Sequence, residues 1–166
     1  YTIEYREGLK ELMELMVGEI NGMLATFRQQ YGVRPENIYQ VNIVGNTVMT
    51  HLFAGIPVKT IASVPFNPVV TRLPRIKAKE LGLKTCPNAI VSSLPMIAGY
   101  IGADTVGCVL ATDMAEEEEI SLMIDIGTNG EIVLGSRDGL LACATAAGPA
   151  LEGAHIQCGL GGISGA

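Results

Sequence analysis

An acidic residue followed by a tight turn stands in the middle of the segment 122–135. Asp125 belongs to an apolar run, and Asn129-Gly130 separates this run from a second apolar, β-branched one, which is typical of a hairpin with a type I′ turn. Such a turn exposes backbone N–H groups for phosphate oxygens, and a carboxylate suits Mg²⁺ or its waters. An ordinary surface hairpin whose Asp caps its own turn explains the same pattern. In the phosphate-binding hypothesis, Asp125 is the metal ligand and a catalytic group. The phosphate-binding residues are Gly127, Thr128, Asn129 and Gly130.

A second turn and a Gly-Pro corner follow the hairpin. The turn Ser136-Arg137-Asp138-Gly139 precedes an apolar run at 140–145, so three short strands are expected to form a β-meander. Gly148 then gives a flexible corner, and Pro149 suits the first position of a helix. Because a helix N-terminus favours anions, we expect this corner to face the same phosphate chain as the hairpin. Its candidate ligand-binding residues are Thr145, Ala147, Gly148 and Pro149.

Another polar corner occurs earlier in the chain. The run 38–44 predicts a buried strand, and a short helix is expected after it, from 47 to 53. A strand, a Gly-Asn corner and a helix are typical of the ligand-facing edge of an α/β sheet. Asn46 and its neighbour have two open roles, as polar ligands or as helix N-caps. The candidate ligands here are Gly45, Asn46 and Thr47. His51 and His155 are expected to be hydrogen-bonded interior histidines, and neither is given a proton-transfer role.

The apolar segment 89–112 raises the question of a membrane span. Asp104 lies inside it, and an acid at the centre of a spanning helix costs about 2.5–3.5 kcal/mol on insertion scales. Pro95 and Gly102 help to divide the segment into a strand, a corner and a helix of a soluble domain. Asp104 is therefore a second candidate catalytic group, which would position a Mg²⁺ water or the attacking water. A structural acid that bonds nearby backbone explains it equally well.

Two further segments limit the possible architectures. Apolar residues recur at three- and four-residue steps from Leu9 to Phe27, which predicts a long amphipathic helix ending at Gly32. Its Met-rich stripe is interpreted as core rather than as a partner surface. Five prolines in 55–88 predict an extended excursion with a short helix only at 76–83. Phe66, between two prolines, suits docking of a partner, although an ordered covering loop explains it too.

Composition excludes several classes of protein. The chain has 166 residues, of which 48% are hydrophobic and 17% charged, so it is long enough for about one domain with a substantial core. A net charge of −6 and few, scattered basic residues disfavour a nucleic-acid role. No secretory signal is visible. The four cysteines are far apart and form no CxxC pair, so no iron–sulfur or zinc motif is present and a reducing cytoplasm is expected.

Four separated blocks together resemble one family. The hairpin at 125–130 and the corner at 145–152 are similar to a lobe of the actin, sugar-kinase and heat-shock ATPase superfamily. When the blocks 43–51 and 94–105 are considered as well, the chain resembles reductive activators of corrinoid proteins. The resemblance implies a ribonuclease-H-like α/β fold, ATP and Mg²⁺ as cofactors, and return of an oxidised cobalt centre to Co(I). It also implies a corrinoid protein as partner, with electrons from an iron–sulfur domain of the same parent chain but outside this segment.

The resemblance also implies a division of the chain. Residues 1–120 would form a helical and strand–helix part containing the excursion 55–88, and residues 121–166 would begin a second, truncated ribonuclease-H-like lobe. The chain is then a fragment of a longer ATPase, inactive by itself, with no nucleic-acid or membrane partner. The alternative is a non-catalytic module that recognises the corrinoid protein without any role for the nucleotide.

Overall fold

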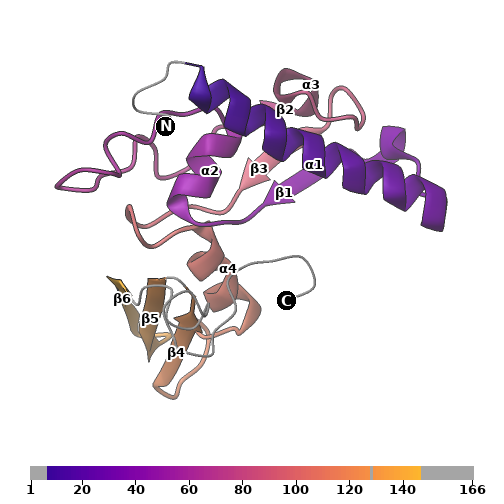
Figure 1. Ribbon diagram of the computed structural model, residues 1–166. Coiled ribbons are helices and arrows are strands. Elements are labelled where there is room, and N and C mark those ends of the chain that lie inside the picture. The colour runs from indigo at the N-terminus through magenta and orange to yellow at the C-terminus, as the bar shows by residue number, and fades with distance from the viewer. Residues whose placement is uncertain (1–6, 128, 147–166) are drawn as a thin grey trace, which may run out of the picture. The chain divides into compact units, whose positions relative to one another are not determined.

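The computed structural model describes residues 7–127 and 129–146, which belong to two compact units (Figure 1). Unit 1 is Tyr1–Val106 and unit 2 is Gly107–Ala166, so the boundary falls within helix α4 (Ala103–Ala111). Both helices and strands are present, which confirms the predicted α/β class. Each unit is described below by itself.

Unit 1 begins with the long helix that the sequence predicts. Helix α1 (Gly8–Tyr31) ends at Gly32, whose φ of 65° is left-handed and whose N–H donates to the Arg28 carbonyl. Val17 is buried, and Met16 packs against the same core. Met23, in the C-terminal half of the helix, is 56% exposed. The apolar stripe is therefore core only in part, because the C-terminal half of the helix carries apolar side chains that the described residues leave in solvent.

The sheet of unit 1 has the order β1-β3-β2. Strands β1 (Gln40–Ile43) and β3 (Ile90–Ser93) are parallel, and β2 (Ile76–Lys77) pairs antiparallel with β3. Paired residues share a face of a sheet, so Val41, Val91 and Ile76 lie together on the face that joins the core with α1. The opposite face is polar.

Short helices precede or connect these strands. They are the 3₁₀ turn η1 (Pro35–Asn37), α2 (Thr47–Phe53) and α3 (Ala78–Leu81). The predicted helix over 76–83 is wrong at its start, because residues 76–77 form β2 and pair with the neighbouring strand. Gly82 ends α3 at a φ of 80°. The rest of the excursion carries little regular structure, as its prolines predict.

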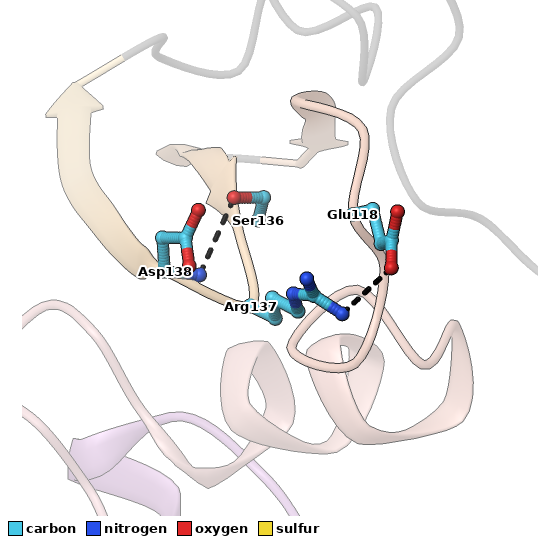
Figure 2. A network of polar contacts seen from close by, with 4 residues as sticks. All are labelled: Glu118, Ser136, Arg137 and Asp138. Atoms are coloured by element: carbon cyan, nitrogen blue, oxygen red, sulfur yellow. Dashed lines mark hydrogen bonds and ion pairs between the residues drawn. The ribbon is translucent and has the colours of Figure 1, made fainter.

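Unit 2 contains the predicted meander. Strands β4 (Ser121–Ile126), β5 (Asn129–Ser136) and β6 (Gly139–Ala146) are antiparallel in the order β4-β5-β6. The second turn is confirmed, since Ser136 pairs with Gly139 across a two-residue loop. Figure 2 shows how this loop is held: Arg137 donates from its guanidinium to Glu118, at 2.8 Å. Its backbone N–H also bonds the Glu117 carbonyl.

One face of the meander is apolar and exposed. Side chains alternate along a strand, and Asp125 shares the more covered face with Met123 and the buried Val133. The opposite face carries exposed apolar side chains from all three strands, namely Leu122, Ile124, Ile126, Leu134 and Leu141. The helix predicted after the meander lies outside the described residues.

No helix in the described parts of the chain is both long and apolar enough to cross a membrane.

Candidate functional site

The predicted phosphate hairpin is the β4–β5 hairpin, but its turn is not where the sequence places it. Ile126 pairs with Gly130, and the Gly127 N–H donates to the Asn129 carbonyl at 3.0 Å, so the chain turns between Gly127 and Asn129. The predicted type I′ turn centred on Asn129-Gly130 is therefore wrong. Both residues belong to β5 and pair on its other side with β6, Gly130 opposite Thr145. Pairing on both sides fixes the register against the local turn signal.

Gly130 has a packing role instead of a turn role. A Cβ atom at this position would lie 3.2 Å from the methyl carbon of Thr145, tighter than ordinary van der Waals contact. Glycine thus allows β5 and β6 to approach beside the turn. Among the candidate residues of unit 2, the structure brings together Asp125, Gly127, Asn129, Gly130 and Thr145 at one end of this sheet. Thr128, Ala147, Gly148 and Pro149 lie outside the described residues.

The sequence analysis missed a second carboxylate next to Asp125. Glu131 is directly opposite Asp125 across the two strands, so both side chains project from the same face, and both are half-buried. Mg²⁺ takes hard oxygen ligands and needs only one or two carboxylates when phosphates and waters complete its shell. No group of three or more metal-binding side chains occurs within the described ranges. The donor set fits Mg²⁺ bound together with a phosphate. Only the strand register could have revealed this pair.

The second polar corner starts helix α2 in unit 1. Asn46 is its N-cap, and the side-chain oxygen accepts from the Met49 N–H at 2.8 Å. Thr47 is buried, and its hydroxyl donates to the Ala98 carbonyl at 2.7 Å. The capping role that the sequence left open is thus confirmed for Asn46. Its amide NH₂ and the surrounding backbone are the atoms that remain for a ligand.

The same corner holds the start of helix α4. The Gly45 carbonyl accepts from the backbone N–H groups of both Ala103 and Asp104, at 3.1 and 3.3 Å. The Asp104 carboxylate accepts from the Thr105 N–H at 2.8 Å. The Thr105 hydroxyl is buried and has no hydrogen-bond partner among the described residues. The structure therefore brings Gly45, Asn46 and Thr47 together with Asp104, beside an unpartnered buried polar atom that a small polar ligand or a water would satisfy.

His51 is fully buried in helix α2, with an exposed fraction of 0%. Its Nδ1 contacts the Thr47 carbonyl at 2.7 Å, and its Nε2 accepts from the Val70 N–H at 3.4 Å. The first contact requires a proton on Nδ1 and the second a lone pair on Nε2, so the imidazole is neutral. Burial lowers the pKa of His51 below its ordinary value of 6.5, against the opposing effect of the Thr47 carbonyl. This is the interior histidine that the sequence predicts.

Comparisons with known proteins place residues 119–166, which include the meander, in a family of actin-like ATPase (ASKHA) domains. The sequence family described as the RACo middle region matches residues 1–117. The family described as the C-terminal domain of RACo, the ASKHA domain, matches residues 119–166. The chain belongs to the RACo family of reductive activators of corrinoid proteins.

Three relatives show the extent of the similarity. The corrinoid activation enzyme RamQ of Eubacterium limosum is 32% identical over 166 residues, which are 100% of this chain and 28% of that protein. A protein of Methanosarcina barkeri named [Co(II) methylated amine-specific corrinoid protein] reductase is 31% identical over 140 residues, 79% of this chain and 26% of its own length.

A solved structure titled reductive activator for corrinoid, iron–sulfur protein superposes with a TM-score of 0.88. Its sequence is 38% identical, and the match covers 100% of this chain and 26% of that one. The chain thus spans about a quarter of the length of the relatives that it matches.

Proposed function

We propose that this chain is the part of an ATP-dependent reductive activator of corrinoid proteins in which the β4–β5 hairpin binds the phosphates of Mg·ATP. Family membership supports the general activity. The observation that carries the assignment to this hairpin is the placement of Asp125, opposite Glu131 and next to the glycine-containing turn. Phosphate and metal ligands are needed at one point, and the position of Asp125 beside the turn supports such a site.

The proposed roles follow from the atoms that each residue has available. Asp125 holds Mg²⁺ or its waters, and the β- and γ-phosphates bond those backbone N–H groups of the segment 127–130 that the fold leaves unbonded, which excludes the Gly127 N–H in the conformation described here. The segment 145–149 adds contacts to the same phosphates. Since phosphoryl transfer depends on positioning and charge stabilisation, these groups would supply most of the catalytic effect.

The polar corner at the start of helix α2 has a smaller proposed part. Asp104 would position a Mg²⁺ water or the attacking water, and the unpartnered hydroxyl of Thr105 supports a polar ligand at this place. Gly45, Asn46 and Thr47 would contact the nucleotide through backbone atoms and the free Asn46 amide group, because the side-chain oxygens of Asn46 and Thr47 are engaged within the fold.

The nucleotide is proposed to act by changing the hold on a corrinoid partner. ATP hydrolysis would switch closure of the two lobes of the parent ATPase and thereby the affinity for the corrinoid protein. One electron from an iron–sulfur domain, outside this chain, would then reduce Co(II) to Co(I). The names of the relatives support the corrinoid partner.

Calorimetric titration of the intact protein with Mg·ATP tests the hairpin. We expect saturable binding by the wild type and its loss in Asp125→Ala. A matched control is Asp138→Ala, which removes an exposed carboxylate from the other turn of the same sheet (Figure 2) and should leave binding unchanged. If the folded wild type does not bind Mg·ATP, or Asp125→Ala binds it equally well, the hairpin is not the phosphate site.

A second candidate is a corrinoid-recognition module without a role for the nucleotide. Its specific support is an apolar surface in the excursion, where the ring of Phe66 meets the edge of Tyr100 at 5.5 Å between centroids. Both rings remain partly exposed, as do Val64 and Ile97. Under this alternative, affinity for the corrinoid protein is the same with and without Mg·ATP and falls in Phe66→Ala. Under the main proposal, Mg·ATP changes that affinity.

A further inference from the structure

The second face of the unit 1 sheet is polar and carries hydrogen bonds between its side chains. Asn42 accepts at its side-chain oxygen from two directions, from the Gln40 Nε2 at 2.9 Å and from the Ser92 hydroxyl at 2.8 Å. The three side chains come from neighbouring strands and lie opposite the core face. Because Gln40 and Ser92 use their donors on Asn42, their oxygens remain available to accept bonds from a ligand.

A hollow of about 450 Å³ opens on this face. Gln40, Ile90 and Ser92 line it from the strands, together with Tyr39 immediately before β1. Arg72 and Arg75 line it from the loop before β2. Its size lies within the range of small-molecule sites, which combine an apolar wall with a few polar groups.

Neither arginine in the hollow has a counter-charge among the described residues. Neither guanidinium has an ion pair or a hydrogen bond with any residue that the structure describes, and both side chains are exposed. Lys77 pairs with Ile90 across the strands, so a third cation projects from the same face. The loop before β2 and β2 itself therefore bring three positive charges to one side of the sheet.

The sequence around the hollow is depleted of acids. Although the chain carries a net charge of −6, residues 37–79 contain no Asp or Glu. Six of its 11 Lys and Arg fall within 59–84, where Glu80 is the only acid: Lys59, Arg72, Arg75, Lys77, Lys79 and Lys84. The expectation that the basic residues are scattered is wrong for this part of the chain, since the fold gathers three of them on one face. Such a local field attracts anions to an otherwise acidic protein.

We propose that this hollow binds a small phosphorylated ligand that carries hydroxyl groups, of the chemical class of sugar phosphates. The planar guanidinium forks of Arg72 and Arg75 match phosphate oxygens and form charge-assisted hydrogen bonds. The acceptor oxygens of Gln40 and Ser92 match sugar hydroxyls, and Tyr39 with Ile90 forms the less polar wall. All the residues of this site belong to unit 1, and none of them is shared with the Mg·ATP hairpin proposed in unit 2.

Titration calorimetry of the intact protein with ribose 5-phosphate, inorganic phosphate and ribose tests this site. We expect ribose 5-phosphate to bind saturably and more tightly than either smaller probe. Removing each guanidinium, as in Arg72→Gln and Arg75→Gln, should weaken binding about tenfold or more, because each provides a charge-assisted bond. Raising NaCl from low to high concentration should weaken wild-type binding as well.

The matched control is Arg34→Gln, an exposed arginine of the same unit that does not line the hollow, and it should bind as the wild type does. Asp125→Ala should also bind ribose 5-phosphate normally, which separates this proposal from the nucleotide one. Far-UV circular dichroism verifies that each variant is folded. The proposal is overturned if ribose 5-phosphate does not bind, if the double variant Arg72→Gln/Arg75→Gln binds it unchanged, or if inorganic phosphate binds equally tightly.

Discussion

The two units differ in how far the apolar face of each sheet is covered by other residues. In unit 1 the apolar face of β1-β3-β2 is covered by α1 and by other apolar side chains, and the opposite face is polar. In unit 2 the more covered face holds Val133, whereas the other face exposes apolar side chains such as Leu122 and Leu141. A sheet must bury its apolar face against another element. Unit 1 therefore contains its own core within the described residues, and the meander of unit 2 needs more chain than they supply.

The largest difference in stability between the units is expected when a core side chain is truncated. Phe53 in α2 is 1% exposed, and Phe53→Ala should destabilise unit 1 by about 3–5 kcal/mol because it leaves a cavity. Leu141→Ala is the control in unit 2, where the side chain is 77% exposed, and it should change stability by less than about 0.5 kcal/mol. Urea unfolding followed by circular dichroism measures both. Similar losses for the two variants would contradict the difference between the units.

Two glycine substitutions test how closely the backbone segments of unit 1 pack. A Cβ at Gly102 would lie 2.6 Å from the Asn46 Cα and 2.8 Å from the Thr47 nitrogen, and backbone atoms cannot move aside easily. Gly102→Ala should therefore cost about 1–3 kcal/mol. Gly22→Ala, in α1 with nothing within 4 Å, should instead stabilise by about 0.5–1 kcal/mol. The same unfolding assay gives both signs, and stabilisation by Gly102→Ala would refute the close contact.

The buried histidine gives unit 1 a pH dependence. The pKa of His51 is lowered in the folded state, so below about pH 6.5 the unfolded chain binds a proton that the folded chain does not. Stability is therefore complete above pH 6.5 and falls as the pH drops towards the folded pKa, by at most about 1.4 kcal/mol per pH unit. Unfolding at pH 7.5 and 5.5 measures the loss. His51→Gln should show a shallower dependence; an unchanged dependence would show that His51 is not the group responsible.

The smallest effect is expected at the surface of unit 2. The ion pair of Glu118 with Arg137 is solvent-exposed (Figure 2), and Glu118→Gln should cost between about 0 and 1 kcal/mol. High salt should reduce the difference further. Glu14→Gln, which removes the exposed i,i+4 pair with Lys10 in unit 1, is the matched control. A cost above that of Gly102→Ala would indicate that the pair anchors the loop more strongly than an exposed pair can.

Much of the fold follows from local signals. Three- and four-residue periodicity predicts α1, apolar runs with turn residues predict the meander, and prolines predict the irregular excursion. What local signals did not predict is pairing. The register of β5, which has a partner on each side, places Asn129-Gly130 inside a strand, and pairing with β3 turns residues 76–77 into β2. Both errors arise where tertiary hydrogen bonds overrule a short-range preference.

The candidate sites, too, could be predicted from the sequence only in part. Asp125 is identifiable from its position beside a turn, but its neighbour Glu131 is found only from the cross-strand register. The hollow between Arg72 and Gln40 combines segments more than thirty residues apart, so no local motif marks it. Its signals in the sequence are the basic residues gathered in 59–84 and the absence of acids from 37–79, which become informative once the strands place Gln40 and Ser92 beside the arginines.

The uncovered face of the meander also bears on biosynthesis. A ribosome releases the N-terminal unit first, so α1 and its sheet can collapse on one another before β4 is made. The strands that follow carry Leu141 and Ile126 into water, on a sheet whose outer strands β4 and β6 pair on one side only within the described residues. Unpaired strand edges with apolar side chains recruit other chains. During synthesis the meander is therefore the part of the described chain whose apolar side chains would most favour association with other chains.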